Sequence, residues 1–228
     1  MTKTAGELAG QLGYRFNDPE LLQAALTHRS ASNRNNERLE YLGDAVLGFV
    51  IAEILYRRFP NAAEGELSRL RASLVKRESL ADIARDLRLG DYLTLGSGEL
   101  KSGGYRRESI LADALEAIFG AIVLDSGFQA SRDCILSLFQ SRLDNLPEAA
   151  SLKDPKTRLQ EYLQARRLSL PAYEVTSVRG RAHNQQFTVI CRVAGLDQTS
   201  EGRGGSRRKA EQQAAEAMLN DLETRHAE

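Results

Sequence analysis

The chain has 228 residues, of which 42% are hydrophobic and 27% are charged, and its 31 basic residues balance 31 acidic residues. This composition is ordinary for a folded protein and excludes a chain that is disordered throughout. No apolar run approaches the ~18 residues that span a bilayer, and the first residues lack the apolar core of a signal peptide. We therefore expect no membrane segment and a cytoplasmic location.

Ligands for a soft metal ion are scarce in this sequence. The two cysteines, Cys134 and Cys191, lie far apart in mostly aliphatic surroundings, and the three histidines share no motif. These features exclude a disulfide framework and a cysteine-based zinc site. Any bound metal ion would therefore need carboxylate ligands.

The first 146 residues predict an all-helical domain. Apolar residues recur there at helical spacing, and prolines and glycines separate the periodic segments. The expected helices cover residues 20–26, 38–59, 65–88, 109–124 and 131–143, with a loop over residues 99–108.

Residues 147–154 have the composition of a linker, and beyond them the hydrophobic period changes. Residues 155–225 predict a small α-β-β-β-α domain, in which two helices cover one face of a sheet. Its expected elements are helix 155–167, strands 172–178, 186–193 and 197–202, and helix 206–224. Residues 151–228 carry 13 basic and 10 acidic residues, whereas residues 1–150 carry 18 and 21. This modest excess of positive charge favours binding of a polyanion by the second domain.

An acidic stripe lies at the start of the helix predicted over residues 38–59. Glu37, Glu40 and Asp44 are spaced i, i+3 and i+7, which puts them on one face within an arc of ~60°. The stripe borders the apolar face of the same helix. Taken alone, the pattern fits either a solvated helix face or a functional acidic site.

A second acidic pair lies in an otherwise apolar segment. Asp113 and Glu116 are spaced i, i+3 within the helix predicted over residues 109–124. A buried carboxylate needs a partner, a proton or a metal ion, and the ordinary alternative is pairing with Arg106 or Arg107. Because carboxylate and water oxygens suit Mg²⁺, two such clusters without His or Cys favour magnesium-dependent phosphoryl chemistry.

Residues 36–47, which run Asn-Glu-Arg-Leu-Glu-Tyr-Leu-Gly-Asp-Ala-Val-Leu, resemble the signature of ribonuclease III. Residues 60–68 and 98–113 fit the same family, while residues 154–161 and 204–211 resemble a double-stranded RNA-binding domain. The order matches the short bacterial two-domain form. The resemblance implies a helical nuclease domain over residues 1–146, a linker over 147–154 and an RNA-binding domain over 155–225.

The resemblance also implies an activity. Ribonuclease III is a Mg²⁺-dependent endoribonuclease, with Mn²⁺ as a substitute, that cuts both strands of an RNA duplex. It leaves 5′-phosphate and 3′-hydroxyl ends with short 3′ overhangs. Its implied substrates are ribosomal RNA precursors, some messenger RNAs and tRNA operons.

By the same resemblance, the acidic residues receive roles. Glu40, Asp113, Glu116 and Asp44 are implied metal ligands, with Asp44 and Glu116 central to catalysis and Glu37 as an outer acid that orients the set. For Glu64 we weigh a supporting acid near the RNA against an ordinary helix N-terminal acid.

Family members are homodimers, which gives Tyr41 an implied role as an aromatic knob in the partner's socket. The alternative is a simple core tyrosine. By the resemblance, Tyr41 is a mild departure, since many relatives carry another aromatic residue there. Its polar tip beside the acidic stripe favours an interface.

Double-stranded RNA-binding domains span ~16 bp by shape rather than by sequence. Three contact regions are expected, with the first helix and the turn between strands each facing a minor groove. The cations of the last helix, which Ser206 would cap, face phosphates across the major groove. The candidate residues are Thr157, Gln160 and Glu161, then His183, and finally Ser206, Arg207, Arg208 and Lys209.

Two other classes of function compete with this interpretation. One is a catalytically silent double-stranded RNA-binding protein of the same fold, which the intact acidic residues disfavour. The other is a nuclease that acts on DNA, which the expected recognition of 2′-hydroxyls by the second domain disfavours.

Overall fold

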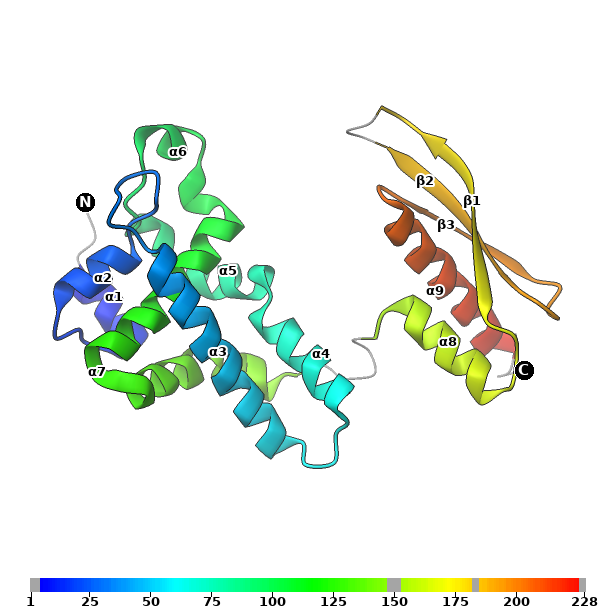
Figure 1. The fold of residues 1–228 in the computed structure, drawn as a ribbon, viewed down its shortest axis with the longest axis horizontal. Coiled ribbons are helices and arrows are strands. Elements are labelled where there is room, and N and C mark those ends of the chain that lie inside the picture. The colour runs from blue at the N-terminus through cyan, green and yellow to red at the C-terminus, as the bar shows by residue number, and fades with distance from the viewer. Residues whose placement is uncertain (1–4, 147–152, 182–184, 226–228) are drawn as a thin grey trace. The chain divides into compact units, whose positions relative to one another are not determined.

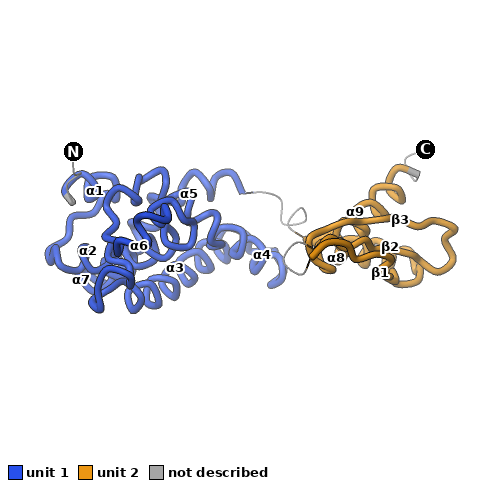
Figure 2. Tube along the Cα trace, turned by 90° about the horizontal axis from the view of Figure 1, so that it is seen from above, with its two compact units in different colours: residues 1–152 blue, residues 153–228 orange. Residues whose placement is uncertain are grey.

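The computed structural model describes residues 5–146, 153–181 and 185–225 (Figure 1). The chain divides into two compact units, Met1–Leu152 and Lys153–Glu228, which Figure 2 shows in different colours. The predicted linker, residues 147–154, falls largely outside the described part of the chain. None of the described helices is long and apolar enough to cross a membrane.

The first unit is helical, as predicted. The longest helices, α3 and α7, pack against each other over much of their length (Figure 1), and their buried faces form the centre of the core through Leu47, Ile51, Leu115 and Phe119. The helices are α1 (Ala5–Leu12), α2 (Pro19–Ala25), α3 (Glu37–Arg58), α4 (Glu64–Val75), α5 (Arg77–Asp86), α6 (Ser97–Lys101) and α7 (Glu108–Asp144), with 3-10 turns η1 (Leu89–Asp91) and η2 (Gly104–Arg106).

The single helix predicted over residues 65–88 was wrong, because the structure divides it into α4 and α5. The break lies at Lys76, whose backbone is extended with φ −64° and ψ 151°. One straight helix of this length would extend over ~36 Å, whereas two shorter helices let Leu70, Leu74, Leu80 and Ile83 all reach the same core.

Two further local predictions were wrong or incomplete. The segment predicted as a loop, residues 99–108, contains the end of α6 and the turn η2. Helix α1 was not predicted, although Leu8 and Leu12 bury its inner face.

The helix α7 is bent sharply at Gly127. The φ of 86° and ψ of 175° at Gly127 are not helical, and a side chain would strain this backbone conformation. The Ser131 hydroxyl donates a hydrogen bond to the Phe119 carbonyl at 3.0 Å. These residues would lie ~18 Å apart along a straight helix, so the chain turns back on itself. The two helices predicted over residues 109–124 and 131–143 are therefore confirmed as separate segments.

The second unit has the predicted α-β-β-β-α order. Its elements are α8 (Pro155–Ala165), β1 (Pro171–Arg179), β2 (Gln186–Val193), β3 (Thr199–Gly204) and α9 (Arg207–Arg225). The strands form an antiparallel sheet in the order β1-β2-β3. Leu159 and Leu163 of α8 pack with Val189 of β2 and Ala214 of α9 in a separate core. The predicted fold class, a helical domain followed by this α+β domain, is confirmed.

Candidate active site

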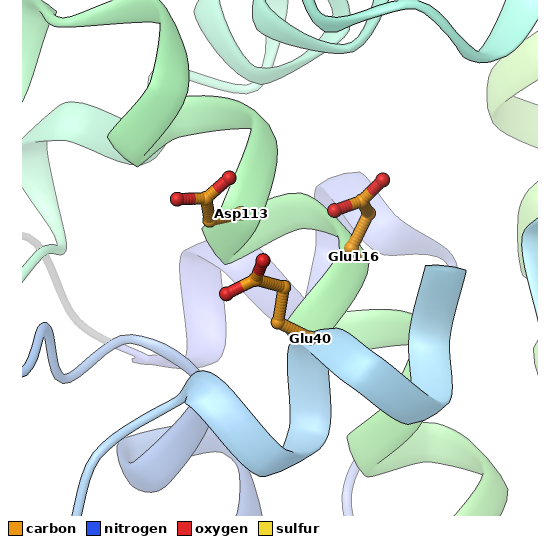
Figure 3. A group of neighbouring side chains, drawn as sticks. All are labelled: Glu40, Asp113 and Glu116. Carbon is orange, nitrogen blue, oxygen red and sulfur yellow. The ribbon is translucent and has the colours of Figure 1, made fainter. Parts of the chain in front are cut away.

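Three of the predicted acidic residues converge where α3 meets α7. One carboxylate oxygen each from Glu40, Asp113 and Glu116 lies within 4.8 Å of the other two. Figure 3 shows Glu40 extending from α3 beside the two acids of α7. All three side chains are half-buried, and among the described residues none of them forms a salt bridge. The structure thus brings together residues from two segments that are far apart in sequence.

Two glycines allow this convergence. A Cβ atom on Gly43 of α3 would lie 1.7 Å from the carbonyl oxygen of Glu116, and one on Gly120 of α7 would lie 2.2 Å from the carbonyl oxygen of Leu39. No other residue fits at either crossing without moving a helix. Neither glycine was identified as important from the sequence. Their signal was available, since a glycine inside a helix costs ~1 kcal/mol and usually has a packing reason.

The electrostatics of this cluster disfavour three negative charges. Burial, followed by the charges of Asp44, Glu40 and Asp113, raises the pKa of Glu116 to about 8. Burial and then the neighbouring Asp113 raise the pKa of Glu40, and burial also raises that of Asp113. A divalent cation among these oxygens would relieve both their repulsion and their desolvation.

The other two acids of the stripe lie beside the cluster. Asp44 is exposed, and its charge contributes to the raised pKa values of Glu116 and Glu40. Glu37 is the first residue of α3 and pairs with Arg29 at 3.2 Å. The structure therefore places Asp44 and Glu37 near the cluster but not in the group of three converging oxygens.

The alternative of pairing with Arg106 or Arg107 is not observed. Arg107 pairs instead with Glu99 at 2.6 Å, and Arg106 lies over the ring of Tyr105, 5.0 Å from its centroid. These cations are occupied elsewhere, so the pair of acids on α7 faces Glu40.

The second unit presents most of the predicted RNA-binding residues on its helices. Thr157 is half-buried on α8, while Gln160 and Glu161 are exposed there. The Lys209 amide donates to the Ser206 hydroxyl at 3.2 Å, so Ser206 caps α9. The exposed cations Arg207, Arg208 and Lys209 form the first turn of α9. His183 lies outside the described residues.

Comparison with known proteins shows the family to which this chain belongs. Residues 18–143 match the family described as ribonuclease-III-like, and residues 155–222 match the double-stranded RNA binding motif. The chain belongs to the ribonuclease III family. It is 59% identical to ribonuclease 3 of Photobacterium profundum, over 98% of this chain and 100% of that protein. It is 58% identical to ribonuclease 3 of Vibrio cholerae, over 97% and 99% of the two chains.

Solved structures support the same assignment for the first unit. The nuclease domain of ribonuclease III from Campylobacter jejuni is 46% identical, with a TM-score of 0.61, and covers 64% of this chain and 99% of that domain. A second structure of that domain, with a TM-score of 0.60, is described for flexibility in a region involved in dimer formation. This member of the ribonuclease III family is therefore an endoribonuclease with a double-stranded RNA-binding domain.

An aromatic surface lies on α3 of this ribonuclease III family member. Tyr41 is 82% exposed, which excludes the alternative of a core tyrosine, and Phe49 and Tyr56 are also exposed on the same helix. Phe49 contacts Phe128 of α7 edge to face, with 5.7 Å between the ring centroids. A group of exposed aromatic side chains on one helix is typical of a surface that contacts another protein.

A hollow of about 460 Å³ opens between the second half of α3 and α4. Phe49, Tyr56 and Leu67 line it, and so does Glu64. Glu64 is the first residue of α4 and accepts a hydrogen bond from the Ser68 hydroxyl at 2.7 Å. Its carboxylate belongs to the wall of this hollow rather than to the three-acid cluster.

Proposed function

We propose that this ribonuclease III family member hydrolyses both strands of double-stranded RNA with Mg²⁺, and that Mn²⁺ can substitute. The observation that carries the proposal is the convergence of Glu40, Asp113 and Glu116, with oxygens within 4.8 Å of one another. Hard carboxylate oxygens on a rigid helix crossing suit Mg²⁺, which takes a few carboxylates and otherwise keeps water as its ligand. A bound ion would supply an ionised water near neutral pH and would neutralise charge on the scissile phosphate.

The acidic residues then have distinct tasks. Glu40, Asp113 and Glu116 would hold the ion, and we assign Asp44 to the same ligand set because its charge already acts on Glu116 and Glu40. Glu37, one turn before Glu40, is assigned to orient the set from outside. Water adds to phosphorus as the bond to the 3′-oxygen breaks, which leaves 5′-phosphate and 3′-hydroxyl ends.

We propose that the active form is a homodimer in which each site cuts one strand. Tyr41 projects near the start of α3, while the hollow lined by Phe49 and Tyr56 lies beside its second half. In a two-fold dimer the same patch serves both partners. Antiparallel packing of two α3 helices would place each Tyr41 at the partner's hollow. Two sites offset along the duplex would leave short 3′ overhangs.

The RNA-binding unit is proposed to set the choice of substrate. Thr157, Gln160 and Glu161 of α8, together with His183, are proposed to contact 2′-hydroxyls in minor grooves. Ser206, Arg207, Arg208 and Lys209 at the start of α9 are proposed to hold phosphates. The proposed substrates are ribosomal RNA precursors, some messenger RNAs and tRNA operons, cut in the cytoplasm, where transcripts are made.

The decisive experiment offers the full chain three substrates: a long RNA duplex, the matching DNA duplex and one RNA strand. Each is incubated with Mg²⁺, with EDTA, and with EDTA followed by excess Mg²⁺. We expect cleavage of the RNA duplex alone, its loss in EDTA and its recovery with Mg²⁺. Sequencing of both product ends tests the 5′-phosphates and the 3′ overhangs.

The competing function is a silent double-stranded RNA-binding protein. An RNA duplex that is bound but left uncut with Mg²⁺ would favour the silent binding protein. Cleavage of the DNA duplex would favour a nuclease that acts on DNA. Mapping RNA ends in cells with and without the protein would test the proposed transcripts.

A further inference from the structure

The carboxylate of Glu211 joins the two helices of the second unit. Its Oε2 accepts from Lys156 Nζ of α8 at 2.7 Å, and its Oε1 accepts from Arg207 Nε of α9 at 2.8 Å. The side chain of Glu211 is only 12% exposed. Hydrogen bonds from Lys156 and then from Arg207 hold the pKa of Glu211 below its ordinary value. Each oxygen of this carboxylate thus binds a different cation.

Lys156 is itself fixed in place. Its ammonium lies 4.3 Å from the centroid of the Tyr173 ring, and its backbone N–H donates to Gln212 Oε1 at 3.0 Å. The amide of Gln212 donates in turn to Asp154 Oδ1, also at 3.0 Å. Asp154 caps α8 by accepting from the Thr157 amide at 3.1 Å. The anchor of Glu211 is therefore a rigid part of the unit.

Helix stability is a weak explanation for the Arg207–Glu211 pair. An acid placed four residues after its cation is the less favourable order in an isolated helix. A negative charge beside Arg207, Arg208 and Lys209 also weakens the field that attracts phosphates. An acidic residue that weakens the attraction of phosphates at this position needs another role that offsets this cost.

The geometry at Arg207 supplies that role. A guanidinium carries five N–H donors in a planar fork. The Nε of Arg207 is engaged by Glu211, which leaves the Nη edge of the fork for a phosphate. Most of the Arg207 side chain remains exposed. A long flexible cation is thereby held in one orientation before RNA arrives, which reduces the entropy lost on binding.

We propose that Glu211 is a positioning residue for double-stranded RNA binding, which Lys156 anchors and which orients Arg207 toward the RNA backbone. The inference rests on the phosphate contacts proposed above for the start of α9. On this proposal the acidic Glu211 strengthens binding of RNA, whereas its negative charge alone would weaken binding.

The test compares Glu211→Gln with Glu216→Gln in the full chain. Glu216 is an exposed acid on the same helix, so the two variants change net charge equally. The probe is an RNA duplex of about 16 bp in EDTA, which spans one binding domain and stays uncut. Kd is measured over a range of salt concentrations at 25 °C, and thermal melting confirms folding.

We expect Glu211→Gln to raise Kd about tenfold and to lower the slope of log Kd against log salt by about 1, the signature of one lost phosphate contact. Glu216→Gln should leave Kd unchanged or slightly lower. An unchanged or lowered Kd for Glu211→Gln would overturn the proposal.

A double-mutant cycle separates positioning from a general loss of structure. In an Arg207→Ala background, Glu211→Gln should change Kd by less than about twofold, because a residue that acts through Arg207 has nothing left to orient. A further full-size loss in that background would overturn the proposal.

Arg207→Lys provides a second variant should Glu211→Gln fail to fold. It keeps the charge at an exposed position but lacks the fork, so we expect Kd to rise about fivefold, and wild-type affinity would overturn the proposal. A variant with Arg207, Arg208 and Lys209 all changed to Ala tests the underlying contacts. Wild-type binding by the triple variant would overturn the proposed phosphate contacts. If the triple variant binds weakly while Glu211→Gln binds like the wild type, only the positioning role is overturned.

Discussion

Gly43 of α3 lies so close to Glu116 of α7 that a Cβ atom at position 43 would be 1.7 Å from the Glu116 carbonyl oxygen. A contact of this kind is incompatible with the present crossing of the two helices. The position of Glu40 relative to Glu116 therefore depends on a residue that has no side chain.

The first prediction is that Gly43→Ala separates the acids. We expect a loss of unfolding free energy of ~1–3 kcal/mol or more from overpacking and a fall in cleavage of at least ~100-fold from misplacement near 1 Å. Thermal melting and a cleavage assay measure these effects. Gly48→Ala on the same helix is the control, because a Cβ there meets nothing within 4 Å. Equal behaviour of the two variants would contradict this account.

The second prediction separates binding from catalysis through Glu116→Gln. The substitution keeps shape and polarity but removes a charge that is proposed to hold the metal ion. We expect cleavage to fall at least ~1000-fold, which is ~4 kcal/mol, while binding of duplex RNA persists or tightens. A gel shift and a single-turnover assay on one duplex measure both. Cleavage within tenfold of wild type would show that the ion is held elsewhere.

The third prediction concerns pH in the absence of metal. The pKa of Glu116 in the folded protein is about 8, against 4.5 for an ordinary glutamate, so the folded state binds this proton more tightly than the unfolded chain. The contribution of Glu116 to stability is therefore full below about pH 4.5 and is lost as pH rises through about 8.

In EDTA, we accordingly expect the melting temperature to fall between pH 5 and pH 8.5. Mg²⁺ should raise it, and more at pH 8.5 than at pH 6, since the ion binds the deprotonated carboxylates. Glu116→Gln should flatten this dependence. The same slope in that variant would assign the effect to other groups.

The fourth prediction is that Tyr41 maintains the dimer. Light scattering of the wild type should give about twice the 25.2 kDa chain mass. Tyr41→Asp should shift the protein toward monomer, because it places a charge in an apolar contact, whereas Tyr41→Phe should remain dimeric. A monomeric wild type that still cuts both strands in one encounter would contradict the two-site arrangement.

The fifth prediction concerns salt. The start of α9 carries three exposed cations, Arg207, Arg208 and Lys209. When they neutralise phosphates, counterions should leave the RNA, so affinity should fall steeply with ionic strength. Changing all three to Ala should reduce the log–log slope by about 3 if each neutralises one phosphate. An unchanged slope would place the phosphates against other residues.

Periodicity in the sequence was sufficient for most of the fold. The long helix over residues 38–59 was predicted within one residue of the observed α3, Glu37–Arg58, because its apolar residues repeat over many turns. The break at Lys76 was not predicted, since no proline or glycine marks it and the apolar pattern continues across it. Packing of both halves on one core determines that break.

The acidic residues were predictable from their spacing, but their meeting was not. Each helix shows only its own acids, and the distance between Glu40 and Asp113 depends on how α3 crosses α7. That crossing is set by Gly43 and Gly120, whose importance shows only when both helices are placed together. The role of Glu211 was missed for the same reason, because its partner Lys156 lies on another helix.

The reversal at Gly127 has a consequence for how the enzyme meets its substrate. Because α7 doubles back, its first half, which carries Asp113 and Glu116, lies in the middle of the unit, with Ile118 and Phe119 fully buried. Close packing there leaves little room for the backbone beneath these acids to shift. A phosphate bound at the proposed metal site would therefore meet a backbone that packing holds in place, so adaptation during docking would fall to the RNA and to nearby exposed side chains.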